Sequence, residues 1–145
     1  MKANLEQLEE LTDWCLRHGT KPMRGATRER LHAWLRERIA DGEVCVGLDE
    51  FGGVRGVLVA WFAYPWAPMV RDTKSEVLFI ADVSCRHRGA ALELARDAAR
   101  LDVWGRAKLF CGFGRKSKEG KMRVFNLKQA TCLIKLALAG REVVS

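Results

Sequence analysis

The chain has 145 residues, of which 48% are hydrophobic and 30% charged, and its formal net charge is +7. This length is usual for one domain, here expected to span 1–145, and the composition excludes a disordered chain. No apolar run approaches the roughly 18 residues that cross a bilayer. The acidic, amphipathic N-terminus is not that of a signal peptide, so we expect a cytoplasmic protein.

The five cysteines are odd in number and widely spaced, and none forms a CxxC pair. Such spacing predicts reduced, buried thiols rather than disulfides, and it predicts no metal site. The cysteines are Cys15, Cys45, Cys85, Cys111 and Cys132.

Two helices are predicted in the first third of the chain. Asn4 and Gln7 have the spacing of a capping box, and apolar residues then recur at helical spacing, which predicts a helix over 4–18. Residues 20–26 contain proline and glycine and predict a loop. Thr27 is expected to cap a second helix that ends at an Asp-Gly pair.

Three strands and a helix follow. Strands over 43–48 and 54–64 are separated by a glycine-rich turn, which predicts an antiparallel hairpin. The second strand is apolar on both faces and should lie centrally in a sheet. A third strand over 76–83 leads into an alanine-rich helix that runs to about residue 103.

The last third predicts a strand over 107–113, a further strand over 121–127 and a helix over 128–139, with the tail as an additional edge strand. The order of elements places a strand–helix–strand unit in an otherwise antiparallel sheet. We therefore expect an α/β fold of the α+β sandwich type, with a mixed, mainly antiparallel sheet flanked by helices.

The junction after the third strand carries the most informative motif. Arg86, Gly89 and Ala91 form the pattern R-x-x-G-x-A. Cations at 86–88 oppose the dipole of the helix that starts there, which favours a bound anion, and small residues let a ligand approach the backbone amides. A diphosphate fits these demands, with an exposed basic turn as the alternative. The predicted binding residues are Val83, Arg86, His87, Arg88, Gly89, Ala90 and Ala91.

With this motif and this order of elements, residues 27–113 resemble the GNAT (GCN5-related N-acetyltransferase) superfamily. The resemblance implies that acetyl-CoA is the acyl donor and that the amides of the turn hold its pyrophosphate. It also implies that the pantetheine arm passes between the strands at 80–83 and 109–113. Two family features have no match in the sequence: a strand before the first helix, and a tyrosine acid in the last part of the chain.

Acyl transfer to an amine by direct attack needs a base for the ammonium and an acid for the departing thiolate. Glu76 and Asp82 lie on the strand that enters the turn and are candidate bases, with Glu76 the better candidate. Glu76 is alternatively a polar strand start, and Asp82 alternatively a partner of Arg86 or Arg88. Tyr64, the only tyrosine, is the candidate acid or else an aromatic loop anchor.

Basic residues are concentrated between 106 and 128, where Glu119 is the only acid. This concentration favours an anionic partner: a phosphate-bearing cofactor, a nucleic acid or an acidic protein surface, with a solubilising face as the alternative. Trp66, between two prolines, is expected to be exposed and is a further candidate for contact. The residues predicted to meet nucleic acid or a protein partner are Arg115, Lys116, Lys118, Lys121 and Arg123.

Two functions follow from these observations. The first is an acyl-CoA-dependent N-acyltransferase. The second is a catalytically inactive GNAT-fold module that binds nucleic acid or protein. Small GNAT-like proteins that resemble this chain occur in bacteriophages, including as virion components, so packaging in a virion is the alternative to the cytoplasm. The sequence leaves the acceptor, the acyl group and the oligomeric state open.

Overall fold

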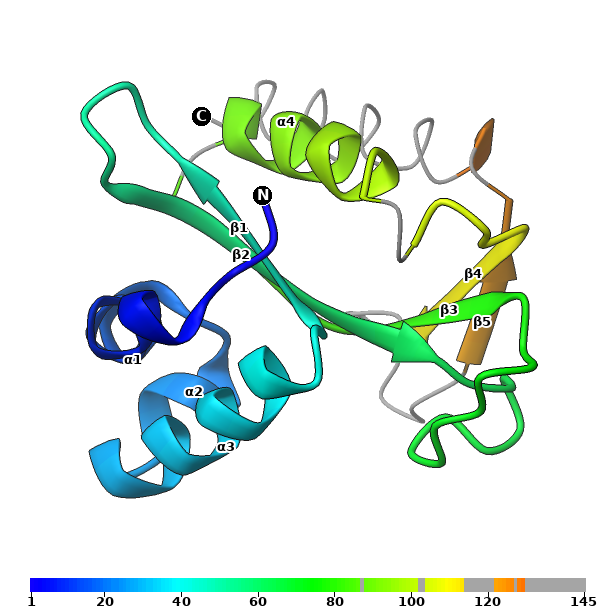
Figure 1. The fold of residues 1–145 in the computed structure, drawn as a ribbon, viewed down its shortest axis with the longest axis horizontal. Coiled ribbons are helices and arrows are strands. Elements are labelled where there is room, and N and C mark those ends of the chain that lie inside the picture. The colour runs from blue at the N-terminus through cyan, green and yellow to red at the C-terminus, as the bar shows by residue number, and fades with distance from the viewer. Residues whose placement is uncertain (87, 102–103, 114–121, 127, 130–145) are drawn as a thin grey trace. The chain divides into compact units, whose positions relative to one another are not determined.

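The computed structural model of the chain describes residues 1–86, 88–101, 104–113, 122–126 and 128–129. Most of the predicted helix over 128–139 and all of the tail lie outside this part. None of the described helices is long and apolar enough to cross a membrane. In chain order (Figure 1), the elements are the 3-10 helix η1 (Leu5–Gln7), helices α1 (Leu8–His18), α2 (Lys21–Gly25) and α3 (Arg28–Ala40), strands β1 (Val44–Leu48), β2 (Val54–Phe62) and β3 (Val77–Cys85), helix α4 (Arg88–Ala99), and strands β4 (Leu109–Phe113) and β5 (Met122–Phe125).

The five strands form one sheet in the order β1-β2-β3-β4-β5. Strands β1 and β2 are antiparallel, β3 and β4 are parallel, and β4 and β5 are antiparallel. The Arg86 N–H donates to Arg55 O and the Ala63 N–H to Val77 O, so β2 and β3 also run in opposite directions. Helix α4 is the crossover that the parallel pair requires. The prediction of a mixed, mainly antiparallel sheet with helices is confirmed.

Two compact units divide the chain. Unit 1 comprises Met1–Val59 and Asp82–Leu101, and unit 2 comprises Ala60–Ala81 and Asp102–Ser145. Strands β2 and β3 contribute residues to both. The single domain over 1–145 stays a prediction.

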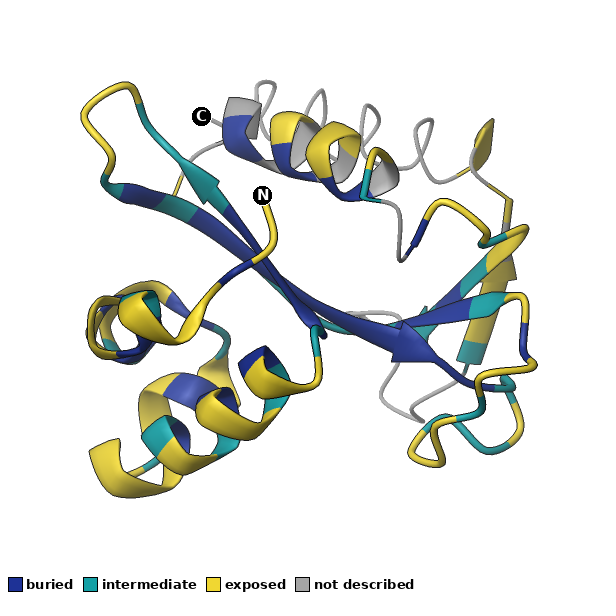
Figure 2. Ribbon diagram, in the orientation of Figure 1, coloured by how far each residue is buried: buried dark blue, intermediate teal, exposed yellow. Residues whose placement is uncertain are grey.

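Unit 1 is built around the apolar strands β1 and β2, with α4 on one face and α1–α3 on the other (Figures 1 and 2). Leu94 of α4 is 1% exposed, and its side chain packs against the backbone at Gly47 of β1 and Gly56 of β2. A Cβ added at Gly56 would lie 3.2 Å from Leu94 Cδ2, and one added at Gly47 would lie 3.5 Å from Leu94 Cδ1. Gly56 therefore lets α4 approach β2 closely, whereas a Cβ at Gly47 would make an ordinary contact. An ion pair between Arg55 and Glu93 (2.7 Å) adds a polar contact.

Both predicted helix caps are present. The Asn4 N–H donates to Gln7 Oε1 at 3.0 Å, and the Arg30 N–H donates to Thr27 Oγ1 at 3.3 Å. The loop predicted over 20–26 is wrong, because most of this segment forms the short helix α2. Its proline lies in the first turn, where a missing N–H costs nothing.

No named strand precedes η1, as expected, but the first three residues pair with β1. The Ala3 N–H donates to Val44 O at 2.9 Å and the Val46 N–H donates to Met1 O at 2.8 Å. Lys2 and Cys45 form an antiparallel bridge between these bonds. Three residues are too few to show strand periodicity, so this pairing beside β1 has no sequence signal.

Unit 2 is organised around a buried serine. Ser75 is 0% exposed; its hydroxyl donates to Ala63 O at 2.8 Å and accepts from the Val77 N–H at 3.0 Å. Arg106 donates to Ser75 O at 2.7 Å, and its guanidinium lies 3.5 Å from the centre of the Phe62 ring. Although Arg106 belongs to the basic stretch of the sequence, its role in the structure is to hold this loop.

Candidate functional site

The strand-to-helix junction in unit 1 is short. Strand β3 ends at Cys85 and α4 begins at Arg88. Arg86, between them, is exposed, and its N–H donates to Arg55 O at 2.8 Å. Of the predicted binding residues, His87 lies outside the described residues, and the side chains of Arg88 and Ala91 are not described either.

The predicted glycine-containing turn is therefore the first turn of a helix. The backbone N–H groups of Arg88, Gly89 and Ala90 have no acceptor within the helix, because the first four amides of any α-helix lack one. The positive end of the helix dipole lies at the same place. Ala90 is small and 3% exposed, so it keeps the helix close to the sheet. These features are those of an anion-binding helix start.

The two faces of β3 carry different groups. Successive side chains of a strand point to opposite faces. Cys85 faces α4, because its Sγ lies 3.2 Å from a Cβ placed at Gly56. Asp82 is on the other face, where its Oδ1 accepts a hydrogen bond from the Thr20 hydroxyl at 3.3 Å. Thr20 lies between α1 and α2, so Asp82 points toward the helical corner that these two helices make.

The Asp82 carboxyl is partly buried at this corner. Burial raises its pKa, and the hydrogen bond from Thr20 only partly opposes that effect. A carboxylate that takes up a proton more readily is a better general base near neutral pH. Burial, together with the charge of Asp82, raises the pKa of Cys15 to about 12, so this neighbouring group stays a neutral thiol.

Two buried polar atoms of unit 1 were missed by sequence reasoning. Ser84 lies on the same face of β3 as Asp82 and is 5% exposed. Its hydroxyl and the Trp14 Nε1–H of α1 have no hydrogen-bond partner in the part of the chain that the structure describes. Buried polar groups are normally paired. No local pattern could have found them, because burial of either group depends on packing between segments far apart in the sequence.

Glu76 lies just before β3, at the end opposite to the helix start. Its side chain is 56% exposed, and Oε2 lies 3.2 Å from Lys108 Nζ. The Lys108 N–H also donates to Glu76 O at 2.9 Å. The structure thus places Glu76 in a surface ion pair at the start of β3 and β4, six positions along the chain from Asp82.

Tyr64 follows β2 in a loop of unit 2. Its ring stacks on Trp66, with centroids 4.8 Å apart and planes at 10°. Trp66 is 79% exposed, as its place between two prolines predicts. The candidate acid therefore belongs to unit 2, whereas Asp82 belongs to unit 1.

The predicted walls of the pantetheine groove are strands β3 and β4. Their parallel ladder joins Val77–Phe79 to Leu109–Cys111. Beyond these pairs β3 continues to Cys85 and β4 to Phe113. The strands are still close at the next position, where a Cβ on Gly112 would lie 3.4 Å from Ile80 O.

The basic stretch is only partly described. Arg123 is exposed on β5, whereas Arg115, Lys116, Lys118 and Lys121 lie outside the described residues. Among the described residues, no group of three or more His, Cys, Asp or Glu side chains is arranged to hold a metal ion.

Comparisons with known proteins place the fold. No protein-family model matches the chain, and no curated protein matches it. The chain is similar in structure to the GphF GNAT-like decarboxylase in complex with isobutyryl-CoA, with a TM-score of 0.57, 18% identity, and coverage of 81% of this chain and 66% of that one. It is also similar to the diaminobutyrate acetyltransferase EctA from Paenibacillus lautus, solved with L-2,4-diaminobutyric acid and coenzyme A; the TM-score is 0.59, the identity 11%, and the coverage 99% and 75%.

A third similar structure is the polyamine N-acetyltransferase of Drosophila melanogaster, with a TM-score of 0.56, 13% identity, and coverage of 94% of this chain and 80% of that one. At such identities the similarity establishes the fold alone. The chain therefore has the GNAT fold, as the order of its predicted elements and the R-x-x-G-x-A junction indicate.

Proposed function

We propose that this protein binds an acyl-CoA and transfers the acyl group to an amine. The observation that carries the proposal is the direct passage from β3 into α4 within a GNAT fold, which sets first-turn amides at the end of the strand that bears Asp82. In the comparison structures whose names specify a small molecule, that molecule is a coenzyme A species or an amine.

The helix start fits the diphosphate of coenzyme A. A diphosphate needs several N–H donors and space beside the backbone, and the amides of Arg88, Gly89 and Ala90 supply the donors. The exposed Arg86 side chain, just before the helix, provides a cation for a phosphate oxygen. The acyl-bearing arm would then run back along β3 toward Asp82.

Asp82 is the proposed base. Its carboxylate takes a proton from the acceptor ammonium, while the Thr20 hydroxyl fixes the orientation of the carboxylate. The neutral amine nitrogen then attacks the thioester carbonyl carbon and the carbon–sulfur bond breaks. The nitrogen gives up its second proton as the amide forms, and the thiolate sulfur takes up one proton, so the products are the amide and free coenzyme A. Because Asp82 and the helix start use opposite faces of β3, acceptor and donor would approach the strand from different sides.

Glu76 and Tyr64, the other two candidate catalytic residues, have lesser roles in the proposal. Glu76 is the alternative base. It ranks second because its carboxylate is at the surface and already forms an ion pair with Lys108. Tyr64 remains the candidate acid, although its ring is stacked on Trp66.

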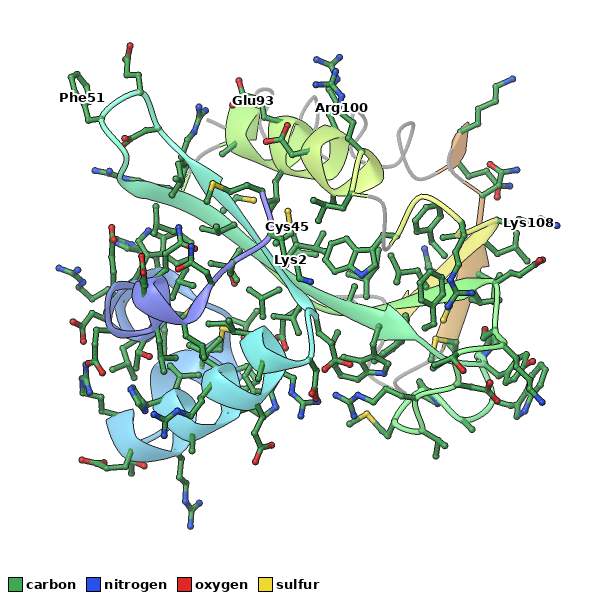
Figure 3. All side chains as sticks on the ribbon, viewed as in Figure 1. Lys2, Cys45, Phe51, Glu93, Arg100 and Lys108 are labelled. Atoms are coloured by element: carbon green, nitrogen blue, oxygen red, sulfur yellow. The ribbon has the colours of Figure 1, made fainter. Side chains whose placement is uncertain are left out.

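Isothermal calorimetry with acetyl-CoA and coenzyme A tests the binding step. Gly89→Glu places a negative charge among the first-turn amides, which repels the diphosphate but suits the helix dipole. We expect binding to weaken at least about tenfold while the unfolding temperature is kept or raised. Arg100→Gln changes net charge equally, just after the other end of α4 (Figure 3), and should leave affinity within about twofold. Wild-type protein that binds no acetyl-CoA at millimolar concentration would remove the proposal.

Release of free coenzyme A, followed by chromatography with a panel of primary amines, tests the chemistry. Asp82→Asn should lower the transfer rate about 100-fold with unchanged acetyl-CoA affinity, since a general base contributes about that factor or more. A comparable loss in Glu76→Gln, with Asp82→Asn active, would move the base to Glu76.

A GNAT-fold module without catalysis is the second candidate. The stacking of Tyr64, the only tyrosine, on Trp66 favours this second function. The Tyr64 ring is held by that contact, which argues against its use as a catalytic acid. Tight acetyl-CoA binding with no coenzyme A release from any amine would support this function over transfer.

A further inference from the structure

The positive charge of the protein is unevenly divided. The sequence of unit 1 contains 13 Lys and Arg and 13 Asp and Glu, whereas that of unit 2 contains 12 Lys and Arg and 5 Asp and Glu. Unit 2 therefore carries the whole formal excess of +7. A surplus of this size on one unit attracts polyanions at long range.

The loop between β2 and β3, in the same unit, exposes an aromatic ring. Trp66 is 79% exposed, and two further apolar side chains of the loop, Met69 and Val70, are 66% and 65% exposed. Tyr64 covers one face of the Trp66 indole by stacking. At 79% exposure, the opposite face is open to a planar ligand.

The exposure of Trp66 is imposed by the structure of the loop. The Ala67 N–H donates to Tyr64 O at 3.0 Å, and the Val70 N–H donates to Ala67 O at 3.1 Å. The Trp61 indole N–H donates to Pro68 O at 2.7 Å, which fixes the loop against the strand. Prolines on either side of Trp66 restrict the backbone further. A pre-organised aromatic surface loses little conformational entropy when it binds.

Cations lie on the same loop. Arg71 and Lys74 are exposed. The Arg71 guanidinium is held 3.8 Å from the centre of the Trp61 ring. Two acids, Asp72 and Glu76, lie on the same loop. Asp72 accepts from the Lys74 N–H at 2.9 Å, and Glu76 pairs with Lys108.

We propose that this loop binds single-stranded nucleic acid, with a base stacked on the open face of Trp66 and the neighbouring phosphates near Arg71 and Lys74. Aromatic stacking combined with a cationic surface is how proteins hold single strands without sequence preference. The surplus charge of unit 2 favours this partner over a neutral protein surface. The proposal uses neither the helix start nor Asp82, and the residue that it shares with the proposed acyl transfer is Tyr64, which stacks on Trp66.

Fluorescence anisotropy of labelled DNA and RNA oligonucleotides of about 12 nucleotides, at about 50 mM salt, tests the proposal. Trp66→Ala should weaken binding at least about tenfold, and Trp66→Phe should stay within about threefold of the wild type. The control is Phe51→Ala, which removes a 91% exposed ring at the tip of the β1–β2 hairpin of unit 1 (Figure 3) and should change nothing. Lys74→Ala should reduce the slope of log affinity against log salt by about one.

Three outcomes would overturn the proposal. One is the absence of saturable binding to either oligonucleotide at low salt. Another is an affinity that Trp66→Ala leaves within about twofold, since charge alone then explains binding. The third is Trp66-dependent sedimentation with phosphatidylglycerol vesicles without oligonucleotide binding, which would make the loop a membrane contact. Unchanged thermal unfolding and acetyl-CoA affinity in Trp66→Ala would show that the fold and the acyl-CoA site are intact.

Discussion

A buried acid at the start of β1 gives the sharpest test of the energetics. Glu43 is 6% exposed, and its Oε1 lies 3.0 Å from Arg38 Nη1. Arg38 Nη2 also lies 3.3 Å from Glu37 Oε2 and 3.7 Å from Asp41 Oδ2. The Arg38 guanidinium therefore interacts with two further carboxylates besides that of Glu43. Burial raises the pKa of Glu43 to about 7; Arg38 opposes this effect and Asp41 adds to it.

The direction of the pH dependence follows from this pKa. The unfolded chain releases the Glu43 proton near 4.5, whereas the folded protein keeps it to about 7. The contribution of Glu43 to stability is therefore greatest below pH 4.5 and is lost as pH rises through 7. The difference in pKa corresponds to about 3 kcal/mol. Glu43→Gln has no proton to lose, so we expect the stability of the wild type relative to this variant to fall by about that amount between about pH 4 and about pH 8.

Urea unfolding of both proteins at the two pH values measures the change. Glu37→Gln is the matched control, because it removes a second Arg38 partner whose side chain is 72% exposed, and its effect should vary little with pH. If the wild type instead gains stability relative to Glu43→Gln as pH rises, the charge of Arg38 outweighs burial and the reasoning is refuted.

Three further predictions concern packing. Ser75→Ala removes the hydroxyl that bonds Ala63 O at 2.8 Å, and urea unfolding should show a loss of about 1–3 kcal/mol; a loss below about 0.5 kcal/mol would contradict a structural role. Gly19→Ala would bring a Cβ into a steric clash with Cys15 O, so stability should fall by about 2 kcal/mol or more; an unchanged unfolding temperature would disprove the clash. Cys15, with its pKa raised to about 12, should resist iodoacetamide in native protein near neutral pH, as peptide mass spectrometry would show, and should react only in denaturant; rapid native labelling would refute its burial.

Local signals located most of the elements. The caps at Asn4 and Thr27 were predictable because each depends on residues three positions apart. Strands β1–β4 were predictable from apolar runs bounded by turn residues, and α4 from its alanine-rich stripe. The helix start at 88 follows from the R-x-x-G-x-A junction, which is itself a contiguous pattern.

The missing parts depend on contacts between distant segments. The Thr20–Asp82 hydrogen bond joins residues 62 positions apart, so no sequence pattern near Asp82 could predict that Thr20 is its partner. The sequence instead indicated the neighbouring Arg86 or Arg88 as a partner of Asp82. The contact of Arg106 with Ser75, across 31 positions, likewise gives one cation of the basic stretch a structural role that composition alone could not predict. Alternation along the third strand could have shown that Asp82 and Cys85 point to opposite faces.

The close packing of α4 on the sheet has a consequence for ligand affinity at the proposed site. Leu94 rests on two positions that have no side chain, Gly47 and Gly56. A methyl group at Gly56 would meet Leu94, Cys85 Sγ and the Ser84 carbonyl oxygen, each at 3.2 Å. One way to relieve that crowding is a shift of α4 away from the strands, and its leading amides would then shift with it. In the proposed function Gly56 contacts no ligand, yet it would set how closely the first-turn amides of α4 lie to the sheet, and we expect Gly56→Ala to change acetyl-CoA affinity without removing a donor.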